Sequence, residues 1–573
     1  MTPNITKREI RFAVHLPVNN YRERDAHYIK EAVHYSDGTI VPRSYIVKDW
    51  KRKIWVTSQV YRNYKEKKEF ELLDRVMEQE CTQSDLNKTV ANLLGTPHLA
   101  NNRNALKDSP YVYGYDLTST SLIKLKSLQK NEGIQTPYSV AFSDIETDIN
   151  TQEILLSTTT YGNKAHTSIL AKFVKNIADV QRRVDAAIKM YLPDYPNLVS
   201  TIKVCRGEVE LIEDTFKVIN EWKPDLLCYW NMSFDVERIL DRLKLFNVNP
   251  TRVLCDQSIP SEYRFCRYKK GITKKVTASG VLKPINPSLQ WHTLHLTAPF
   301  YVIDAMCVYR QLRMATQEEP SYSLDAILGK ELKKSKLKFK EADAHKGANW
   351  HIFMQENYPI EYIVYNIYDC LGMAELEEKN KDLSSSMPAF AGITDFAKFN
   401  SNPKKIVDAL FSFGLERGKI IGTVPNLNKP EEELEAADIE DIVEDSDEDS
   451  LDVSKYKTLD LKNWIQLLPQ ANLVHDGLQC LEEYPNVKTN IRGVVIDMDS
   501  VSSYPSCTLV GNVSKETCVN ELISIEGIAE EVFREQNLSI CLGNSNLTEF
   551  FSVMFDMPSL DSMDSLIEVV CQR

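Results

Sequence analysis

Four carboxylates and one tyrosine are the side chains whose types and spacing point to chemistry. Asp144 and Glu146 lie two residues apart, Asp235 ends the segment Asn231-Met232-Ser233-Phe234-Asp235, and Tyr365 precedes Asp369 by four residues. Carboxylates gathered in one place would repel each other, and two divalent cations would remove that conflict. Such a pair of ions, about 3.5–4 Å apart, can activate a water and stabilise the leaving oxygen of a phosphodiester. The set therefore predicts a two-metal hydrolytic site in which the hydroxyl of Tyr365 orients the water.

The segments that carry these residues alternate between strand and helix patterns. Apolar runs predict strands at 137–142, 153–161, 226–229 and 300–303, and helical periodicity predicts helices at 177–191, 209–222, 234–246, 305–313, 322–328 and 358–381. Residues two apart on a strand share a face, as do residues four apart on a helix, so each pair of site residues would point together. The alternation predicts an α/β fold, mixed α+β, with helices around a sheet. A further helix is expected at 68–77.

In their order along the chain, these segments resemble the three exonuclease motifs of family B DNA polymerases, of the kind found in large-genome tailed bacteriophages. Asp144 and Glu146 match the first motif, Asn231, Phe234 and Asp235 the second, and Tyr365 and Asp369 the third. The resemblance covers the chain from near its start to residue 515 and is weaker at the N-terminus. It implies a ribonuclease-H-like 3′–5′ proofreading domain, in which the four carboxylates bind metal and Asn231 and Phe234 contact DNA.

A fourth segment, 499–506, follows the apolar run 494–496 and resembles the first palm motif of the same family. The resemblance implies a set of palm residues, with Asp499 and the carbonyl of Ser500 as metal ligands and the backbone amides of Ser502, Ser503 and Tyr504 around the triphosphate of a dNTP. Successive N–H groups at a turn bind anions well. Ser503 stands where the family usually has leucine. The sequence contains neither the second palm carboxylate motif nor the fingers motif, so we expect only the start of a polymerase palm.

Two basic stretches are candidates for DNA contacts. In 263–275, two strand-like runs flank Lys269-Lys270-Gly271, which predicts a hairpin turn there, and similar polymerases carry a hairpin at this place. Its candidate DNA-binding residues are Arg264, Arg267, Lys269 and Lys270. In 51–68, seven basic residues are interleaved with Trp55, Tyr61 and Tyr64, which suits phosphate contacts and base stacking. The alternatives are a solvated loop for the first stretch and an ordinary exposed strand and helix for the second.

The net charge of the chain gives a misleading impression of its partners. The formal net charge is −13, but thirteen acidic and no basic residues fall in 431–452, and the rest of the chain is balanced. We expect this run to be a disordered or solvated surface insertion, and the alternatives are a lure or clamp for a basic partner and mimicry of the charge of DNA. The twelve cysteines are scattered without a CxxC pair, and no apolar run is long enough to span a membrane. These features favour the cytoplasm, and the resemblance to bacteriophage polymerases implies that of a bacterial host, or a phage replication compartment.

We expect four regions along the chain. They are an N-terminal domain with nucleic-acid contacts (1–130), the exonuclease domain (131–400), a return to the N-terminal domain with the acidic insertion (401–485), and a partial palm with the start of the fingers (486–573). The sequence thus predicts a family B DNA polymerase whose proofreading site holds two ions, Mg²⁺ or Mn²⁺. Its expected partners are primer–template DNA, a single-stranded 3′ end, dNTP, a separate C-terminal polymerase chain and a sliding clamp. The alternatives are a stand-alone DEDD-type 3′–5′ exonuclease and a non-catalytic DNA-binding scaffold.

Overall fold

The computed structural model describes residues 3–422, apart from residues 20, 21, 23, 132–134, 277–281 and 315–317, and four short strands closer to the C-terminus. The chain divides into two units, residues 1–442 and 443–573. In the second unit, β19 (Cys518–Ile523) pairs antiparallel with β22 (Ile567–Gln572), and β20 (Cys541–Leu542) pairs with β21 (Ser545–Asn546). The expected palm residues at 499–506 and the acidic run 431–452 lie outside the described residues.

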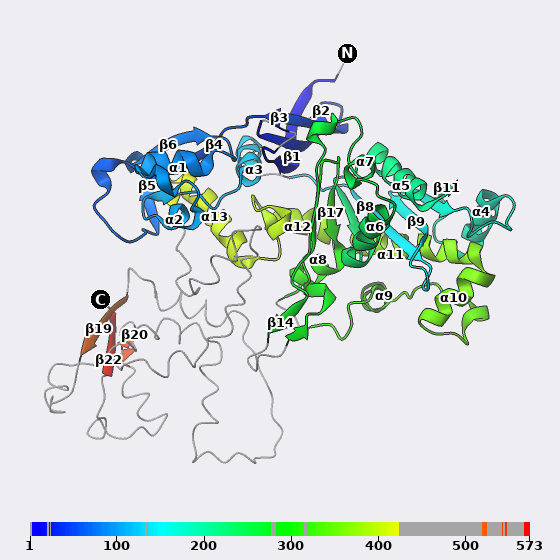
Figure 1. The fold of residues 1–573 in the computed structure, drawn as a ribbon. Coiled ribbons are helices and arrows are strands. Elements are labelled where there is room, and N and C mark those ends of the chain that lie inside the picture. The colour runs from blue at the N-terminus through cyan, green and yellow to red at the C-terminus, as the bar shows by residue number, and fades with distance from the viewer. Residues whose placement is uncertain are drawn as a thin grey trace, which may run out of the picture. The chain divides into compact units, whose positions relative to one another are not determined.

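An eight-stranded mixed sheet forms the centre of the first unit (Figure 1). Its strand order is β11-β10-β9-β8-β12-β17-β16-β13. β8, β12 and β17 run parallel, whereas β9 and β16 run antiparallel to both of their neighbours. The strands span β8 Val140–Thr147, β9 Ile154–Tyr161, β10 Lys164–Leu170, β11 Val199–Cys205, β12 Leu226–Tyr229, β13 Cys266–Lys269, β16 Thr293–Leu296 and β17 Tyr301–Asp304. The predicted α/β class is confirmed, with a mixed sheet.

Helices cover both faces of this sheet, because its central strands are apolar on both sides. All four residues of β12 are buried. One face packs against α5, α6 and α7, and the other packs against α4, α8 and α11. The helices span α4 Val180–Tyr191, α5 Glu208–Trp222, α6 Met232–Leu245, α7 Pro250–Val253, α8 Ala305–Leu312, α9 Leu324–Leu332, α10 Ala348–Asn357, α11 Pro359–Asn380, α12 Met387–Ala391 and α13 Asn402–Glu416. In the described part of the chain, none of the helices is long and apolar enough to cross a membrane.

The N-terminal region forms two small sheets beside three helices. Its elements are β1 Ile5–Leu16, β2 Ala26–Tyr35, β3 Ile40–Lys48, β4 Arg52–Thr57, β6 Val76–Cys81, β7 Val112–Tyr113, α1 Leu86–Leu94, α2 Arg103–Asp108 and α3 Ser119–Lys130. β1, β2 and β3 form one sheet, and β6, β4 and β7 form the other. Residues 402–421 pack against this region, where Phe411 of α13 shares a core with Trp55 and Tyr113.

The predicted elements around the site residues are confirmed, but one helix is wrong. The four predicted strands correspond to β8, β9, β12 and β17, and the six predicted helices correspond to α4, α5, α6, α8, α9 and α11. The segment 68–77, expected to be helical, instead forms β5 (Phe70–Leu72) and the start of β6. β5 pairs with β18 (Lys419–Ile421), and β6 pairs with β4. Partners distant in the sequence therefore override the local helical pattern.

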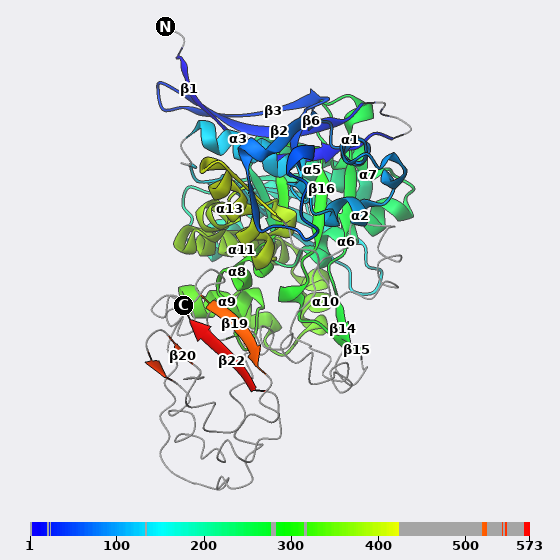
Figure 2. The same cartoon turned by 90° about the vertical axis from the view of Figure 1, so that its left-hand side faces the viewer.

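The basic stretch 263–275 belongs to two different strand pairs. β13 pairs with β16, and β14 (Lys274–Val276) pairs with β15 (Leu282–Pro284). The turn expected at Lys269-Lys270-Gly271 is therefore wrong, because this segment connects β13 to β14, which pairs with β15 and not with β13. The β14–β15 pair extends away from the eight-stranded sheet (Figure 1 and Figure 2). A Cβ atom at Gly271 would lie 2.7 Å from the carbonyl oxygen of Trp291, so the backbones approach too closely there for any side chain.

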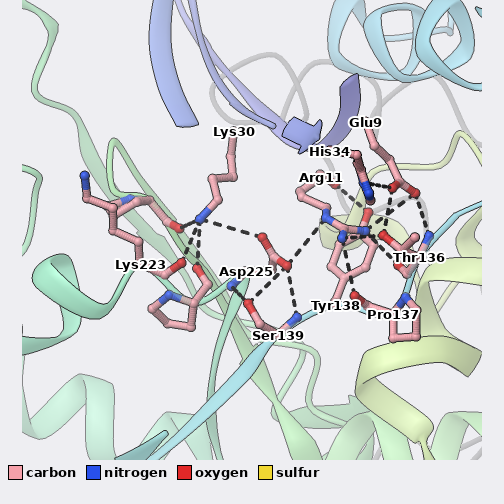
Figure 3. A network of polar contacts seen from close by, with 12 residues as sticks. Glu9, Arg11, Lys30, His34, Thr136, Pro137, Tyr138, Ser139, Lys223 and Asp225 are labelled. Atoms are coloured by element: carbon pink, nitrogen blue, oxygen red, sulfur yellow. Dashed lines mark hydrogen bonds and ion pairs between the residues drawn. The ribbon is translucent and has the colours of Figure 1, made fainter. Parts of the chain in front are cut away.

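A buried network of charged groups joins the N-terminal sheet to the eight-stranded sheet (Figure 3). The ammonium of Lys30 on β2 donates to three backbone carbonyls, those of Lys223, Pro224 and Pro299, at 2.9, 3.2 and 2.6 Å. Asp225 lies 3.6 Å from Lys30 and 3.5 Å from Nε of Arg11, and it accepts hydrogen bonds from the backbone N–H and the hydroxyl of Ser139. Ser139 directly precedes β8, Asp225 directly precedes β12, and Pro299 lies just before β17. The network therefore fixes the beginnings of the three parallel strands.

Candidate metal centre

Three of the four predicted carboxylates come together where α11 crosses β8. Asp144 and Glu146 share one face of β8, as their spacing predicts, and Asp369 lies on α11. One carboxylate oxygen from each of the three residues lies within 4.8 Å of the other two. A group of this kind can hold a divalent cation through its oxygen atoms. The fold thus brings the first and the third predicted segments into one centre.

Asp235 stands beside this group, in the first turn of α6. Its Oδ1 accepts a 3.2 Å hydrogen bond from the backbone N–H of Ile145, the residue between the two strand carboxylates. Asp304, which the sequence motifs do not predict, ends β17 and accepts hydrogen bonds from the backbone N–H groups of Met232 at 2.8 Å and Cys307 at 2.9 Å. Asp304 therefore fixes the first turns of α6 and α8, and through α6 it positions Asp235.

Each strand carboxylate accepts a hydrogen bond from a neutral side chain of α11. The hydroxyl of Tyr362 donates to Oε2 of Glu146 at 2.5 Å, and Nδ2 of Asn366 donates to Oδ2 of Asp144 at 2.6 Å. Neither donor is among the residues predicted from the sequence. The available signal was their spacing, because residues 362 and 366 lie on the helix face that also carries residues 365 and 369.

Lys336 supplies the positive charge of the centre. Its Nζ donates to Oδ2 of Asp369 at 2.6 Å and to the hydroxyl of Tyr365 at 3.1 Å. The residue lies between α9 and α10, outside any helix or strand. The sequence analysis missed it, because no periodicity distinguishes it from the other lysines of the segment 330–340. Tyr365 is thereby held beside Asp369, in the same cluster as the strand carboxylates.

The carboxyl groups of the centre are crowded and poorly hydrated. Burial, followed by the charges of Asp235, Glu146 and Asp369, raises the pKa of Asp144 well above its usual value. Burial raises the pKa of Glu146 to about 7, and it also raises the pKa values of Asp235 and Asp369. Burial alone would lower the pKa of Lys336, but Asp369, Tyr365 and Asp144 together outweigh it, and that pKa lies well above its usual value. The centre therefore holds more carboxylates than a single lysine can neutralise.

The stability of the metal-free protein should fall as the pH rises from 4.5 to about 7. Folded Glu146 keeps its proton in this window after the unfolded chain has lost it, so rising pH favours unfolding, by roughly 3 kcal/mol for this residue. A bound cation displaces the proton, so Mg²⁺ should raise the melting temperature more at about pH 8 than at about pH 5. Scanning fluorimetry with Mg²⁺ and with EDTA measures the rise in melting temperature at each pH. Glu146→Gln cannot ionise at this position, so it should reduce the difference between the rises at the two pH values. Equal increments in the unaltered protein would contradict the prediction.

The predicted DNA contacts next to Asp235 lie at the start of α6. Asn231 is the residue that precedes this helix, and its Oδ1 accepts a 3.0 Å hydrogen bond from the hydroxyl of Ser233. Phe234 has 48% of its surface exposed, although it adjoins the buried Asp235. The residue before Asp235 therefore offers an exposed aromatic ring to a ligand.

The four basic residues predicted to bind DNA lie on β13 and the segments on either side of it. The guanidinium of Arg264 donates to residues 257 and 259 at 2.5–2.9 Å, so it closes its own loop, and its contact with DNA stays a prediction. Arg267 and Lys269 lie on β13. Lys270 is exposed, and its ammonium lies 2.8 Å from Glu237 of α6.

The basic stretch 51–68 is largely engaged within the N-terminal region. Arg52 is buried and donates to three backbone carbonyls and a glutamine side chain. Lys67 donates to the carbonyls of residues 107 and 109, and Trp55 is buried in the core. These contacts favour the ordinary structural interpretation of this stretch over DNA binding.

No protein-family model matches the chain, and a comparison with curated proteins gives no match either. The function of this centre must therefore follow from its own geometry and chemistry.

Proposed function

We propose that this chain carries the 3′–5′ exonuclease of a family B DNA polymerase and removes nucleotides from the 3′ end of a DNA strand. The observation that carries the proposal is the meeting of Asp144, Glu146 and Asp369 within 4.8 Å of one another. Residues of the first and third motifs thus share one site, as the resemblance to the exonuclease motifs requires. Asp235 of the second motif borders that site through the backbone of Ile145.

The donor set suits Mg²⁺ or Mn²⁺. The candidate ligand atoms are carboxylate oxygens, which hard divalent cations prefer. Oδ1 of Asp369 is buried and accepts no hydrogen bond from any residue that the structure describes, so a cation would satisfy it. The raised pKa of Asp144 also favours a bound cation, because positive charge would relieve its repulsion from the neighbouring carboxylates. Two ions bound here would activate a water and stabilise the leaving oxygen of the phosphodiester.

The position of the centre in the sheet supports this function. In the sheet, β9 lies on one side of β8, and the later strands β12 and β17 lie on its other side. Ligands of α/β sheets bind outside the carboxyl ends of strands at such a switch in strand order. Asp235 follows β12 at this place. A mixed sheet with helices on both faces also fits the ribonuclease-H-like domain that the resemblance implies.

The side chains around the carboxylates have separate tasks in this proposal. Lys336 holds the hydroxyl of Tyr365 beside Asp369, where the hydroxyl can orient the water that attacks the terminal phosphodiester. Phe234, exposed next to Asp235, offers a ring on which a terminal base can stack. Lys336 is the lysine that the described residues place against these carboxylates, and bound cations would neutralise the phosphate.

DNA synthesis would depend on the expected palm residues Asp499, Ser500, Ser502, Ser503 and Tyr504. They lie outside the described residues, so dNTP binding and a separate C-terminal polymerase chain belong to the proposal through the sequence resemblance alone. A stand-alone exonuclease would use the same carboxylate centre. Primer extension in the presence of the second chain separates these two functions.

Degradation of a 5′-labelled DNA single strand tests the proposal. The full chain with Mg²⁺ should shorten the strand from its 3′ end, and EDTA should stop the reaction. The chain alone should fail to extend a primer, and a second chain that carries the missing palm carboxylate should restore extension. If extension is not restored, the stand-alone exonuclease is the better description. A chain that binds Mg²⁺ but leaves the strand intact would contradict the proposal.

Replacing Lys336 with methionine should slow cleavage by about 30- to 100-fold, or ~2–3 kcal/mol in the activation barrier. Methionine keeps the length of the side chain but releases both Asp369 and Tyr365. Because the lysine also lowers the pKa of Asp369, the acidic limb of the pH–rate profile should move to higher pH. Single-turnover cleavage at saturating Mg²⁺ measures both effects. Lys338→Met, an exposed position in the same loop, is the control, and cleavage by Lys336→Met at the control's rate would contradict the assignment.

A further inference from the structure

The two strand carboxylates and their two donors are matched in spacing. Glu146 and Asp144 are two residues apart on β8, and their partners Tyr362 and Asn366 are four residues apart on α11. Two residues of a strand span roughly 6.6 Å, and four residues of a helix span roughly 6 Å. Two donors four residues apart on the helix can therefore reach both carboxylates of the strand. The later helix residue binds the earlier strand residue, so the helix and the strand run in opposite directions at this crossing.

Each donor leaves one carboxylate oxygen for another ligand. Tyr362 binds Oε2 of Glu146, and Asn366 binds Oδ2 of Asp144. Among the residues that the structure describes, no hydrogen bond to Oε1 of Glu146 or to Oδ1 of Asp144 is formed. Both donors are neutral, so they orient the carboxylates without the positive charge that would compete with a cation. Lys336 carries a positive charge, but it also binds only Oδ2 of Asp369, and Oδ1 has no partner among the described residues.

Tyr362 is itself held rigidly. Its ring is 0% exposed, and its hydroxyl lies 2.7 Å from Nδ1 of His351 and 3.1 Å from Nε2 of Gln355, both on α10. Gln355 also donates to the carbonyl of Thr147, the residue after Glu146 on β8, at 3.0 Å. α10 therefore binds both the donor and the strand that carries the acceptor. This double attachment fixes the direction in which the hydroxyl of Tyr362 points.

We propose that Tyr362 and Asn366 are positioning residues that orient Glu146 and Asp144 so that one oxygen of each faces a bound divalent cation. Groups that hydrogen-bond to metal ligands typically change metal affinity by about 10- to 100-fold when they are removed. The inference rests on the metal centre of the proposed function, but it concerns cation binding and not cleavage. The two can therefore be tested separately.

Binding of Mn²⁺ to the full chain, followed by electron paramagnetic resonance in the absence of DNA, tests the inference. Tyr362→Phe removes one hydroxyl and keeps the ring, and it should weaken Mn²⁺ binding by about tenfold. Asn366→Leu, which keeps the approximate size of the side chain, should have an effect of similar size. The control is Tyr368→Phe on the same helix, because Tyr368 is also buried but forms no hydrogen bond to the strand carboxylates among the described residues. It should bind Mn²⁺ as the unaltered chain does.

The cleavage assay gives the second measurement. In Tyr362→Phe, the Mg²⁺ concentration for half-maximal cleavage should rise by about tenfold, while the rate at saturating Mg²⁺ recovers to within about threefold. Unaltered Mn²⁺ affinity in both Tyr362→Phe and Asn366→Leu would overturn the inference, and so would a chain that binds no Mn²⁺. If Mn²⁺ binding weakens as expected but the unaltered chain cuts no DNA, the inference stands and the proposed function fails.

Discussion

Replacing Asp144 with asparagine should reduce removal of nucleotides from a DNA 3′ end by about a thousandfold or more, which is ~4 kcal/mol in the activation barrier. Asp144 lies at the middle of the carboxylate group, where its pKa responds to the charges of Asp235, Glu146 and Asp369. An amide keeps the shape of the side chain and can still accept the hydrogen bond from Asn366. The only large change is the loss of a charged metal ligand. Single-turnover cleavage of a labelled strand at saturating Mg²⁺ measures the effect.

The same substitution should stabilise the metal-free protein. Four crowded carboxylates, of which Asp235 and Asp369 are buried, destabilise the fold when they ionise, so removal of one of them relieves repulsion. We therefore expect the melting temperature of Asp144→Asn in EDTA to rise at about pH 8, while activity is lost. The matched control is Asp241→Asn on the exposed side of α6, which should change neither quantity. Intact cleavage by Asp144→Asn, or a lower melting temperature together with lost activity, would contradict a role in metal binding.

The elements that carry the carboxylates could be predicted because each has a strong local pattern. β12 is a short apolar run that ends just before the segment containing Asp235, and α11 keeps apolar residues at helical spacing on both sides of Asp369. The shared face of Asp144 and Glu146 follows from the two-residue period of a strand. Their nearness to Asp369 does not follow from any local pattern. It depends on where α11 crosses β8, and the sequence analysis reached it only through a family resemblance.

The groups that orient the carboxylates could not be predicted, because their contacts are made between elements. Lys336 lies in an irregular loop, and nothing local separates it from Lys338, which is exposed and two residues away. Tyr362 has the type and spacing of a helix-core residue, and its partner Glu146 is 216 residues away. A hydrogen bond over that distance in the sequence is specified by packing of the whole domain.

Two errors in the N-terminal half have the same physical origin. The segment 68–77 has helical periodicity, yet strand partners at 52–57 and 419–421 determine its structure. The Lys-Lys-Gly sequence at 269–271 has the composition of a turn, but Gly271 is needed where the backbone passes within contact distance of Trp291. Glycine serves close approach as well as turns, and the sequence alone does not tell which applies.

Replacing Lys30 with methionine should lower the free energy of unfolding by about 3–5 kcal/mol. The ammonium of Lys30 is fully buried, where it donates to three backbone carbonyls and lies 3.6 Å from Asp225. Methionine fills similar space but leaves these carbonyls without a donor and leaves Asp225 with less positive charge nearby. Urea unfolding followed by circular dichroism measures the change, with the slope of the transition as a check on the extent of unfolding.

Lys53→Met is the matched control, because Lys53 forms a 2.6 Å ion pair with Glu78 in which both side chains are nearly half exposed. Exposed pairs contribute about 1 kcal/mol or less, so the two substitutions separate burial from charge pairing. The carbonyls that Lys30 binds precede β12 and β17, whereas Asp235 and Asp304 lie at the other ends of these strands. Cleavage by Lys30→Met at low temperature should therefore stay within about threefold of the unaltered rate. Equal destabilisation by both substitutions would mean that the N-terminal sheet is held by apolar packing and that this buried network adds nothing specific to its attachment.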